Sequence, residues 1–459
     1  MEAMSERAGP DGPDDGGPRG GLRRSLGVRD LVVYGLLFIA PMAPVGVFGV
    51  LDAKSHGAVA AVYLVATVAM GFTAVSYAQM VRAVPRTGSV YAYARAGLGE
   101  AAGFLAGWMA LLDYLLIPAV AYLFSGIALH SLVPDVPRWV WTALAVLVTT
   151  GLNLAGVRTA AAVGFAVLVA ELAVLAVFVV AASVVLVRDG AQRGWATPFT
   201  AVGGFSASAV LSAVSVAVLS YLGFDAIATF VEEAVGASAA VARAVLWCLV
   251  VSGLLFVAQT WLAALLEPLS PEQLAADPAA QGSAFYDTVE DSVGHWLHVL
   301  VAASKAVGAA FAALAGQAAA GRLLFAMGRD GRLPRSLGVV DPGSAVPRRA
   351  LLVSAAITLV AAVWAADRDD GLDRLTSVVD IGALTAFTLL HASVVGWYVV
   401  RHGSRDWGRH LVVPVLGVLV IGAVVAEAAG SAQVVGLVWL AVGLLVVAVR
   451  SASAVGGRR

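Results

Sequence analysis

The sequence is poor in charged residues, in cysteine and in lysine. Only 13% of its 459 residues are charged, whereas a soluble globular domain carries about 25%, so an ordinary soluble fold is excluded. Its one cysteine, Cys248, lies in an apolar run, which excludes a disulfide framework and a cysteine metal cluster. Lysine occurs only at Lys54 and Lys305, and all other basic side chains apart from histidine are arginines.

Motifs for several kinds of chemistry are missing as well. The sequence has no phosphate-binding P-loop pattern, no zinc motif, no nucleophile elbow and no basic patch of the nucleic-acid-binding kind. His130 and His391 have no partners at metal-binding spacing. We therefore expect no metal, no cofactor, no nucleic-acid partner and no enzymatic activity.

Long apolar segments dominate the sequence instead. It is 60% hydrophobic, with a mean hydropathy of +0.87, and apolar runs of about 20 residues, the length that spans a bilayer, recur throughout. An all-α integral membrane protein with twelve transmembrane helices is predicted. The predicted spans are 31–51, 57–80, 102–131, 139–156, 160–187, 205–232, 243–266, 293–321, 350–366, 375–400, 411–427 and 430–449.

The ends of the chain and its basic residues predict an orientation. Residues 1–30 are rich in Gly, Pro, Asp and Arg and should form a disordered tail, with no signal-peptide pattern. With the N-terminus inside, 22 Lys and Arg residues fall on the inner side and six on the outer side, and Lys305 falls within a span. Because cytoplasmic segments carry the excess of basic residues, both termini, including the tail 450–459, should be cytoplasmic. The sequence is rich in Arg, Ala, Val and Gly and has only two lysines, a bias typical of a GC-rich bacterial genome. A bacterial plasma membrane is therefore expected.

Two of the spans contain helix breakers. The first holds Pro41, Pro44 and Gly46, and proline removes a helix hydrogen bond and clashes with the preceding turn. The sixth holds Gly223 beside Asp225, and an ionised Asp in a bilayer is costly unless it lines a cavity. Since the breaks lie in the first and the sixth span, five positions apart in the order of spans, 31–187 and 205–400 are predicted to be inverted repeats, followed by two further helices in 411–449. One proline alone would favour a simple kink, but matched breaks favour a transport site.

Four motifs carry a resemblance to a known superfamily. They are Gly223-Phe224-Asp225 followed by Glu232-Glu233, RLLFAMGRDGRLP from Arg322 to Pro334, Pro85 to Ser89 with Tyr91 and Tyr93, and GWMALLDYLLIP from Gly107 to Pro118. Together they resemble the amino acid–polyamine–organocation permeases, and the fourth is similar to the putrescine-importer-like branch. The resemblance implies a leucine-transporter-like five-plus-five inverted repeat with broken helices 1 and 6. It also implies transport of amines or amino acids, by proton symport or by exchange.

The substrate site is expected at the two breaks. The candidate substrate-binding residues are Ala43, Pro44, Val45, Gly46, Tyr114, Gly223, Phe224 and Asp225. The Asp225 carboxylate could bind a substrate ammonium or cap the second half of helix six, and both roles can hold together. Relatives that bind a carboxylate use a glycine-rich turn in helix one, whereas here two prolines lack the amide donors. Putrescine-like amines are therefore favoured, with neutral or cationic amino acids as the alternative.

Three further ionisable residues lie within the predicted spans. Asp113 is a candidate second amine site, or else a structural partner of a neighbouring helix. Glu171 and Lys305 are predicted to interact and to carry proton coupling, with a static salt bridge as the competing interpretation. The segment 311–316 lacks the hydroxyl groups that sodium-coupled relatives use as ligands, so sodium coupling is disfavoured.

The preferred interpretation is a permease that works by alternating access and either couples transport to protons or exchanges one substrate for another. A membrane-embedded enzyme would need a catalytic His or paired acids at a membrane face, and the acids here lie deeper. A transporter-like sensor would bind the substrate without moving it. Flux into liposomes separates these classes. The expected partners are a small amine or amino acid, protons and the lipid bilayer.

Overall fold

The computed structural model describes residues 26–86, 89–155, 157–231, 234–340, 347–368, 370–428 and 430–456. Within these ranges the protein is built from helices, and the one β-type pairing is an isolated bridge between Leu26 and Ala234. Most of the predicted tail 1–30, the last residues of the tail 450–459, and Glu232-Glu233 lie outside the described residues.

The described residues contain ten helical segments that are long and apolar enough to cross a membrane. They are Val28–Gly46, Val59–Ala83, Glu100–Leu132, Val163–Arg188, Ala207–Phe230, Ser238–Leu266, His295–Arg329, Arg348–Ala366, Arg374–Arg401 and Gly408–Ala426. These ten coincide with ten of the twelve predicted spans. The two remaining predicted spans, 139–156 and 430–449, correspond to helices α6 (Arg138–Ala155) and α18 (Gly430–Gly456).

The elements follow one another as a series of long helices joined by short ones. The first half comprises α1 (Val28–Ile39), η1 (Ala43–Gly46), α2 (Phe48–Lys54), α3 (Val59–Ala83), α4 (Ser89–Leu98), α5 (Glu100–Leu132), α6 and α7 (Val157–Arg188). The second half comprises α8 (Thr197–Thr200), α9 (Ala207–Ala217), η2 (Val218–Tyr221), η3 (Phe224–Phe230), α10 (Ala237–Leu266), α11 (Pro271–Ala276), α12 (Pro278–Gln281), α13 (Ala284–Ser292), α14 (His295–Arg329), η4 (Arg335–Gly338), α15 (Arg348–Ala366) and α16 (Gly371–Val394). The π-helical segments η5 (Val395–Arg401) and η6 (Gly408–Val412), α17 (Val413–Ala426) and α18 complete the chain.

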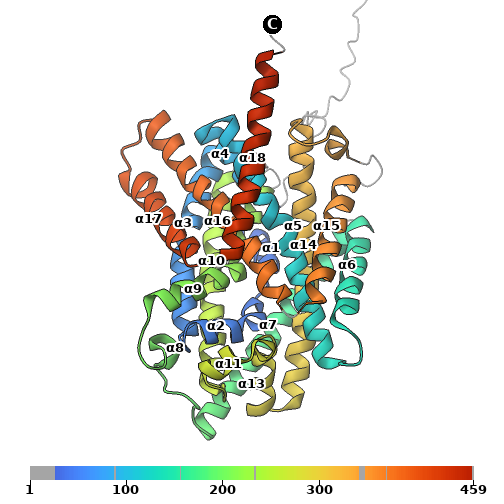
Figure 1. Cartoon of the computed structure of the whole chain (residues 1–459), viewed down its shortest axis with the longest axis vertical. Helices are drawn as coiled ribbons and strands as arrows, with labels where there is room; N and C mark the ends of the chain where they lie inside the picture. Colours follow the sequence, from blue (N-terminus) through green and yellow to red (C-terminus); the bar gives the residue numbers. More distant parts are fainter. Residues whose placement is uncertain are drawn as a thin grey trace, which may run out of the picture.

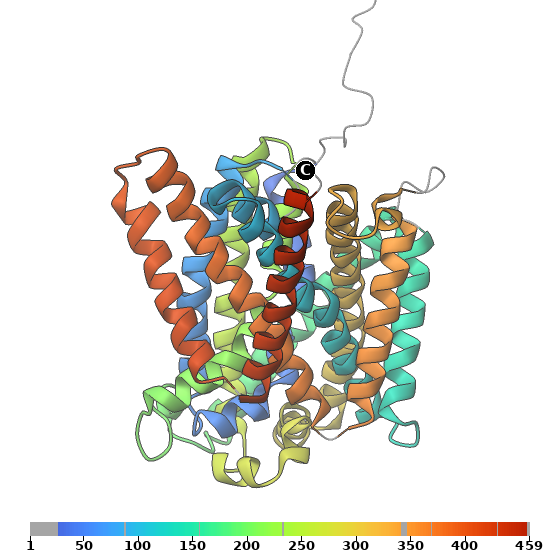
Figure 2. The same cartoon turned by 45° about the horizontal axis from the view of Figure 1, so that its top comes forward.

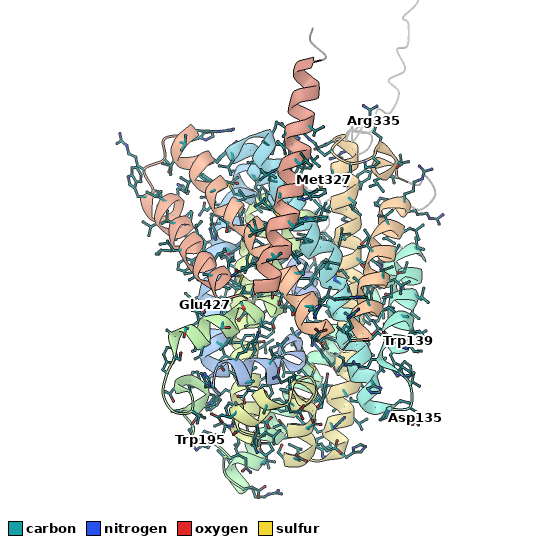
Figure 3. All side chains as sticks on the ribbon, viewed as in Figure 1. Asp135, Trp139, Trp195, Met327, Arg335 and Glu427 are labelled. Atoms are coloured by element: carbon teal, nitrogen blue, oxygen red, sulfur yellow. The ribbon has the colours of Figure 1, made fainter. Side chains whose placement is uncertain are left out.

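The long helices stand side by side, and the two ends of the bundle differ (Figures 1 and 2). One end, which we call the α18 end, carries the C-terminal end of α18 and Arg335 (Figure 3). The opposite end, the α11 end, carries the short helices α8, α11 and α13, with Trp195 and Asp135 (Figures 1 and 3).

The helices of the two halves pair in matching order. The α1 helix packs against η3, α3 packs against α10, and α5 packs against α14. The first, second and third helices of one predicted repeat therefore contact the first, second and third helices of the other. Side chains at these contacts form one large apolar cluster that encloses both predicted breaks.

Both segments with helix breakers are interrupted at the predicted residues. The α1 helix ends at Ile39, and a short 3-10 turn separates it from α2. Pro41 and Pro44 explain this interruption, because neither can donate a backbone hydrogen bond. In the second half, η2 and η3 are separated at Leu222 and Gly223, where Gly223 has φ +112°. This conformation is accessible to glycine and strained for other residues.

Candidate functional site

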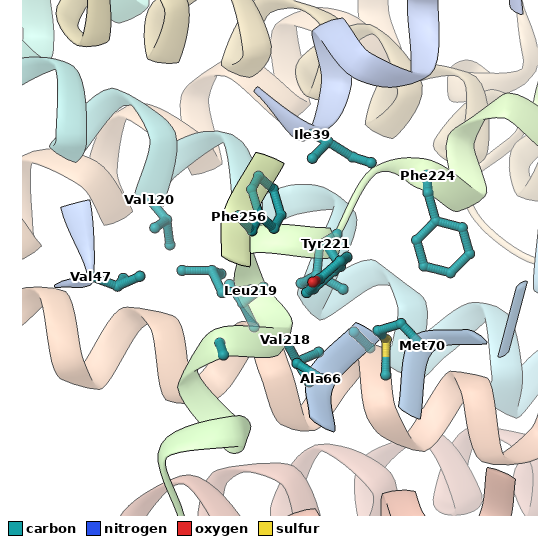
Figure 4. Packing of buried hydrophobic residues seen from close by; sticks show 14 of the residues in the cluster. Ile39, Val47, Ala66, Met70, Val120, Val218, Leu219, Tyr221, Phe224 and Phe256 are labelled. Atoms are coloured by element: carbon teal, nitrogen blue, oxygen red, sulfur yellow. The ribbon is translucent and has the colours of Figure 1, made fainter. Parts of the chain in front are cut away.

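The two breaks pack directly against each other. A Cβ atom placed on Gly223 would lie 3.0 Å from the Cβ of Phe38, at the end of α1. The ring of Tyr34 stacks on that of Phe230 in η3, with centroids 5.4 Å apart. Figure 4 shows side chains from both breaks, including Ile39 and Leu219, gathered in one apolar cluster. The interrupted helices therefore meet deep inside the protein, where an open backbone needs polar partners.

Two side chains from neighbouring helices donate hydrogen bonds to backbone carbonyl groups of the first break. The Nε2 of Gln259, in α10, donates to the Pro41 carbonyl at 2.9 Å. The Nζ of Lys305, in α14, donates to the Met42 carbonyl at 3.1 Å and lies 4.9 Å from the centroid of the Phe124 ring. The break in helix one is thus held by an amide and by a cation from the second half of the chain.

A small cavity of about 50 Å³ lies between the breaks. Its walls come from both interrupted helices and from α5 and α14, and they are mostly apolar. Ser220 and Lys305 supply the polar groups, and Ala43 is the predicted site residue that lines it. The volume holds only a few water molecules, so an amine or amino acid requires the breaks to separate.

A larger pocket opens at the α11 end. It has a volume of about 620 Å³ and reaches Val47, the residue that follows η1. Lys54 of α2, Tyr286 of α13 and Arg368 also line it. The first break is therefore approached from the α11 end by a pocket more than ten times larger than the cavity between the breaks.

A buried ion pair holds the second half of helix one at the same end. The guanidinium of Arg193, in the loop after α7, donates to both oxygens of Asp52, at 2.8 and 2.9 Å. It also donates to the Leu269 carbonyl at 2.5 Å. The side chains of Arg193 and Asp52 are 9% and 0% exposed. A bidentate pair of this kind fixes position and orientation together, so α2 is tied to two loops of the α11 end.

The predicted amine anchor, Asp225, is buried and already bonded. Its Oδ2 accepts from the Tyr114 hydroxyl at 2.5 Å and from the Tyr77 hydroxyl at 3.4 Å. The structure thus brings together Tyr114, Gly223 and Asp225 from the predicted site. Asp225 lies in the first turn of η3, where a carboxylate suits the positive end of a helix. Neither Asp225 nor the two tyrosines that bind it line the central cavity.

Asp113 lies beside this group. It precedes Tyr114 on α5 and is buried, and its Oδ1 has no hydrogen-bond partner among the described residues. Its neighbour Tyr114 donates to Asp225, so the two acids lie in the same buried region. The α16 helix approaches it closely, because a Cβ atom on Gly382 would lie 3.2 Å from the Asp113 amide nitrogen. Its predicted role as a second amine site remains a prediction.

Glu171 and Lys305 are brought to one region without a direct bond. The Glu171 side chain contacts Gly308, one turn after Lys305 on α14, and its charge interacts with that of Lys305. No ion pair joins the two within the described part of the chain, and neither Glu171 oxygen has a hydrogen-bond partner there. Lys305 instead bonds the first break. Their proposed part in proton coupling is not tested by this arrangement.

The other predicted site residues form the two breaks themselves. Ala43, Pro44, Val45 and Gly46 make up η1, and the ring of Phe124 lies against Gly46 so closely that no side chain would fit there. Phe224 is fully buried. Its ring packs edge-on against Tyr77 at 5.8 Å and lies 6.1 Å from the ring of Phe387 in α16. It is therefore a packing residue of the buried cluster in this conformation.

Some residues of the site carry no signal in the sequence. Gln259 and Tyr77 are single polar residues within long apolar helices, and their bonds to Pro41 and Asp225 span 218 and 148 residues of sequence. A polar side chain within a membrane span was the available clue, since such residues usually find a buried partner. The local sequence pattern does not predict which residue that partner is.

Comparison with known proteins agrees with this architecture. A family described as amino acid permease matches residues 31–443. The low-affinity putrescine importer PlaP of Escherichia coli is 29% identical over 435 residues, which cover 93% of each chain. The branched-chain amino acid permease BcaP of Bacillus subtilis is 26% identical over 458 residues, covering 93% of this chain and 92% of that protein.

A third relative widens the range of transported compounds. The methylthioribose transporter of Bacillus subtilis is 25% identical over 451 residues, and the alignment covers 93% of both chains. All three named relatives are thus transporters, and each match runs through the interrupted helices and the helices around them. With its ten apolar helices long enough to cross a membrane, this chain is a multi-pass membrane protein that belongs to the amino acid permease family of the amino acid–polyamine–organocation superfamily.

Proposed function

We propose that this protein is a secondary active transporter that moves a small amine or amino acid by alternating access around the two breaks. The observation that carries the proposal is the pair of interrupted helices that line one small cavity, with carbonyl groups of the first break bound by Gln259 and Lys305. Interrupted helices at matching positions of two halves mark the binding site in secondary transporters.

The proposed topology has twelve spans, with inverted repeats over 31–187 and 205–400 and two further helices in 411–449. The matching contacts of α1 with η3, α3 with α10 and α5 with α14 support this division. The distribution of arginine supports cytoplasmic termini in a bacterial plasma membrane. In this orientation the α18 end faces the cytoplasm, and the larger pocket faces outward.

For the substrate we place putrescine-like amines first. The Asp225 carboxylate, with Tyr114 beside it, would bind an ammonium group once helix six shifts and the hydroxyl bond at 2.5 Å is exchanged for the substrate. Phe224 would then face the ammonium, and an aromatic face contributes about 0.5–2 kcal/mol to such a contact. The putrescine importer among the relatives supports this choice.

Neutral amino acids are the second candidate, and the cavity itself favours them. Its walls are aliphatic and aromatic, its one charged lining residue in the described chain is the cation Lys305, and no carboxylate lines it there. An aliphatic side chain would suit these walls, and Lys305 would suit a carboxylate. The branched-chain amino acid permease among the relatives supports this reading.

For proton coupling we propose Glu171 and Lys305. A buried carboxylate without hydrogen bonds, close to a buried ammonium, is poised to change protonation when the surrounding helices move. Uptake driven by a proton gradient, measured for Glu171→Gln in liposomes, tests this assignment. Undiminished gradient-driven uptake would remove Glu171 from the mechanism.

A thermal-shift panel on purified protein tests the substrate class. Putrescine, basic amino acids and branched-chain amino acids are compared, because a ligand stabilises the folded state that binds it by about 2.7 kcal/mol at one hundred times its dissociation constant. Stabilisation by putrescine that disappears in Asp225→Asn supports the amine assignment. Stabilisation by the neutral amino acids alone would reject it in favour of the second candidate.

A further inference from the structure

Two acids and three tyrosines form a closed cluster beside the second break. Tyr77 comes from α3, Tyr93 from α4, Asp113 and Tyr114 from α5, and Asp225 from η3. The rings of Tyr77 and Tyr93 meet edge-on with centroids 6.0 Å apart. All five side chains are buried. The cluster thus joins four elements at a point where water is scarce.

The bonding of Asp225 is that of an ionised carboxylate. Two hydroxyls converge on one oxygen, and the shorter bond, 2.5 Å from Tyr114, has the length of an O–H···O⁻ bond. The Tyr77 hydroxyl also lies 3.4 Å from the Ser89 Oγ, which links α4 to the same network. Several donors on one acceptor favour the charged form. Of the two acids, Asp225 is therefore the one whose surroundings suit a negative charge.

Asp113 is in the opposite situation. Its Oδ1 receives no hydrogen bond from any described residue, and its neighbour on α5, Tyr114, donates to the carboxylate of Asp225. The Tyr93 hydroxyl also lacks a partner among the described residues. Two carboxylates that share a dry site do not both ionise, so the pair holds one proton.

We propose that Asp113 binds a transported proton, which the ionised Asp225 holds in place, and that this second proton site is separate from Glu171 and Lys305. Asp113 itself lies next to Tyr114 on α5 and against the α16 backbone at Gly382. Tyr114 and Tyr77 contact Asp225, and Ser89, Tyr93 and Phe387 contact Tyr77. A proton fits this close-packed cluster, whereas a second substrate ammonium would require room among the rings.

The proton's release follows from the movement of helix six and rests on the proposed transport function. Asp225 lies in the first turn of η3, directly after the break. When η3 moves in the inward-open state, after the substrate has left Asp225, the bonds from Tyr77 and Tyr114 are absent and water reaches both acids. Asp113 then gives its proton to water on the proposed cytoplasmic side. The electron pair of the broken O–H bond stays on the carboxylate oxygen. Binding of the next proton from the outer side restores the closed cluster.

Infrared spectroscopy of protein with isotope-labelled aspartate tests the protonation directly and needs no substrate. The wild type should show the carbonyl stretch of a protonated aspartic acid at neutral pH, and Asp113→Asn should lose it. Glu171→Gln and the exposed control Asp406→Asn should keep it. Asp225→Asn removes the like charge, so the band should titrate at lower pH. A wild type without the band, or a band that persists in Asp113→Asn, overturns the proposal.

A transport measurement separates this proposal from the function on which it rests. Asparagine resembles a protonated aspartic acid in shape and supplies donors and acceptors, so Asp113→Asn should bind substrate as the wild type does. Its uptake should lose the dependence on an imposed pH gradient. Weaker binding of putrescine with unchanged binding of a monoamine would instead make Asp113 a second amine site and overturn the proton assignment. Failure of the wild type to transport any substrate rejects the proposed function, while the infrared band still decides the state of Asp113.

Discussion

Replacing Lys305 by methionine should destabilise the protein more than any other single change near the breaks. The substitution removes the donor to the Met42 carbonyl and the cation beside the Phe124 ring, and it leaves Glu171 without the opposite charge. The lost donor to a buried carbonyl costs about 1–3 kcal/mol, and the lost attraction to Glu171 adds about 1–3 kcal/mol. Methionine keeps a long flexible chain, so the loss reports the charge rather than the volume.

The double variant Glu171→Gln with Lys305→Met should recover part of that loss. No ion pair joins the two side chains in the described structure, so their attraction should stay below the roughly 4 kcal/mol expected for contact at 4 Å in an effective dielectric of 20. A coupling of about 1–3 kcal/mol is therefore expected. The fall in the thermal midpoint of the double variant should be smaller than the sum of the two single falls.

The assay is the loss of monodisperse protein on heating in one detergent, with all variants made in parallel. Lys54→Met is the matched control, because Lys54 is the other lysine of the chain and lies at the end of α2. Its effect should add to that of Glu171→Gln without coupling. Additive behaviour of the Glu171 and Lys305 variants as well would refute the electrostatic interaction between them.

Three further predictions concern the breaks and the α11 end. Gly223→Ala should abolish transport and lower the free energy of unfolding by about 1–3 kcal/mol. Gly204→Ala, at a glycine with φ +113° and open space around it, should carry the same backbone strain and keep transport. Equal transport by the two variants would contradict close packing at the break. Gln259→Leu should lower thermal stability by about 1–3 kcal/mol because a buried carbonyl loses its donor, and an unchanged midpoint would contradict this role. Arg193→Met should lower the free energy of unfolding by about 3–5 kcal/mol. Arg188→Met breaks an exposed ion pair and should leave the thermal midpoint unchanged. Equal effects of the two variants would show that the buried pair contributes no more than a surface pair.

The interruptions could be predicted from the sequence because their causes are local. Pro41 and Pro44 remove backbone donors wherever the chain runs, and Gly223 lowers the cost of a positive φ. The ten long apolar helices likewise follow from composition and length. For these features the physical cause and the sequence signal are the same residues.

The partners of the site residues could not be predicted in this way. Asp225 was recognisable as a costly residue, but its bond to Tyr114 depends on how η3 packs against α5. Lys305 was recognisable as a charge within a span, yet its bond goes to the Met42 carbonyl and not to Glu171. Such contacts join residues more than 100 positions apart, and their geometry is set by the packing of whole helices.

Uptake into proteoliposomes under an imposed proton gradient tests the central claim most directly. Labelled putrescine and labelled leucine are supplied outside liposomes that are alkaline inside, with empty liposomes as the control. The account predicts that at least one of the two compounds accumulates above its external concentration, and that a protonophore or Gly223→Ala abolishes the accumulation. Saturable binding of either compound without accumulation or exchange would contradict it, and would make the protein a sensor rather than a transporter.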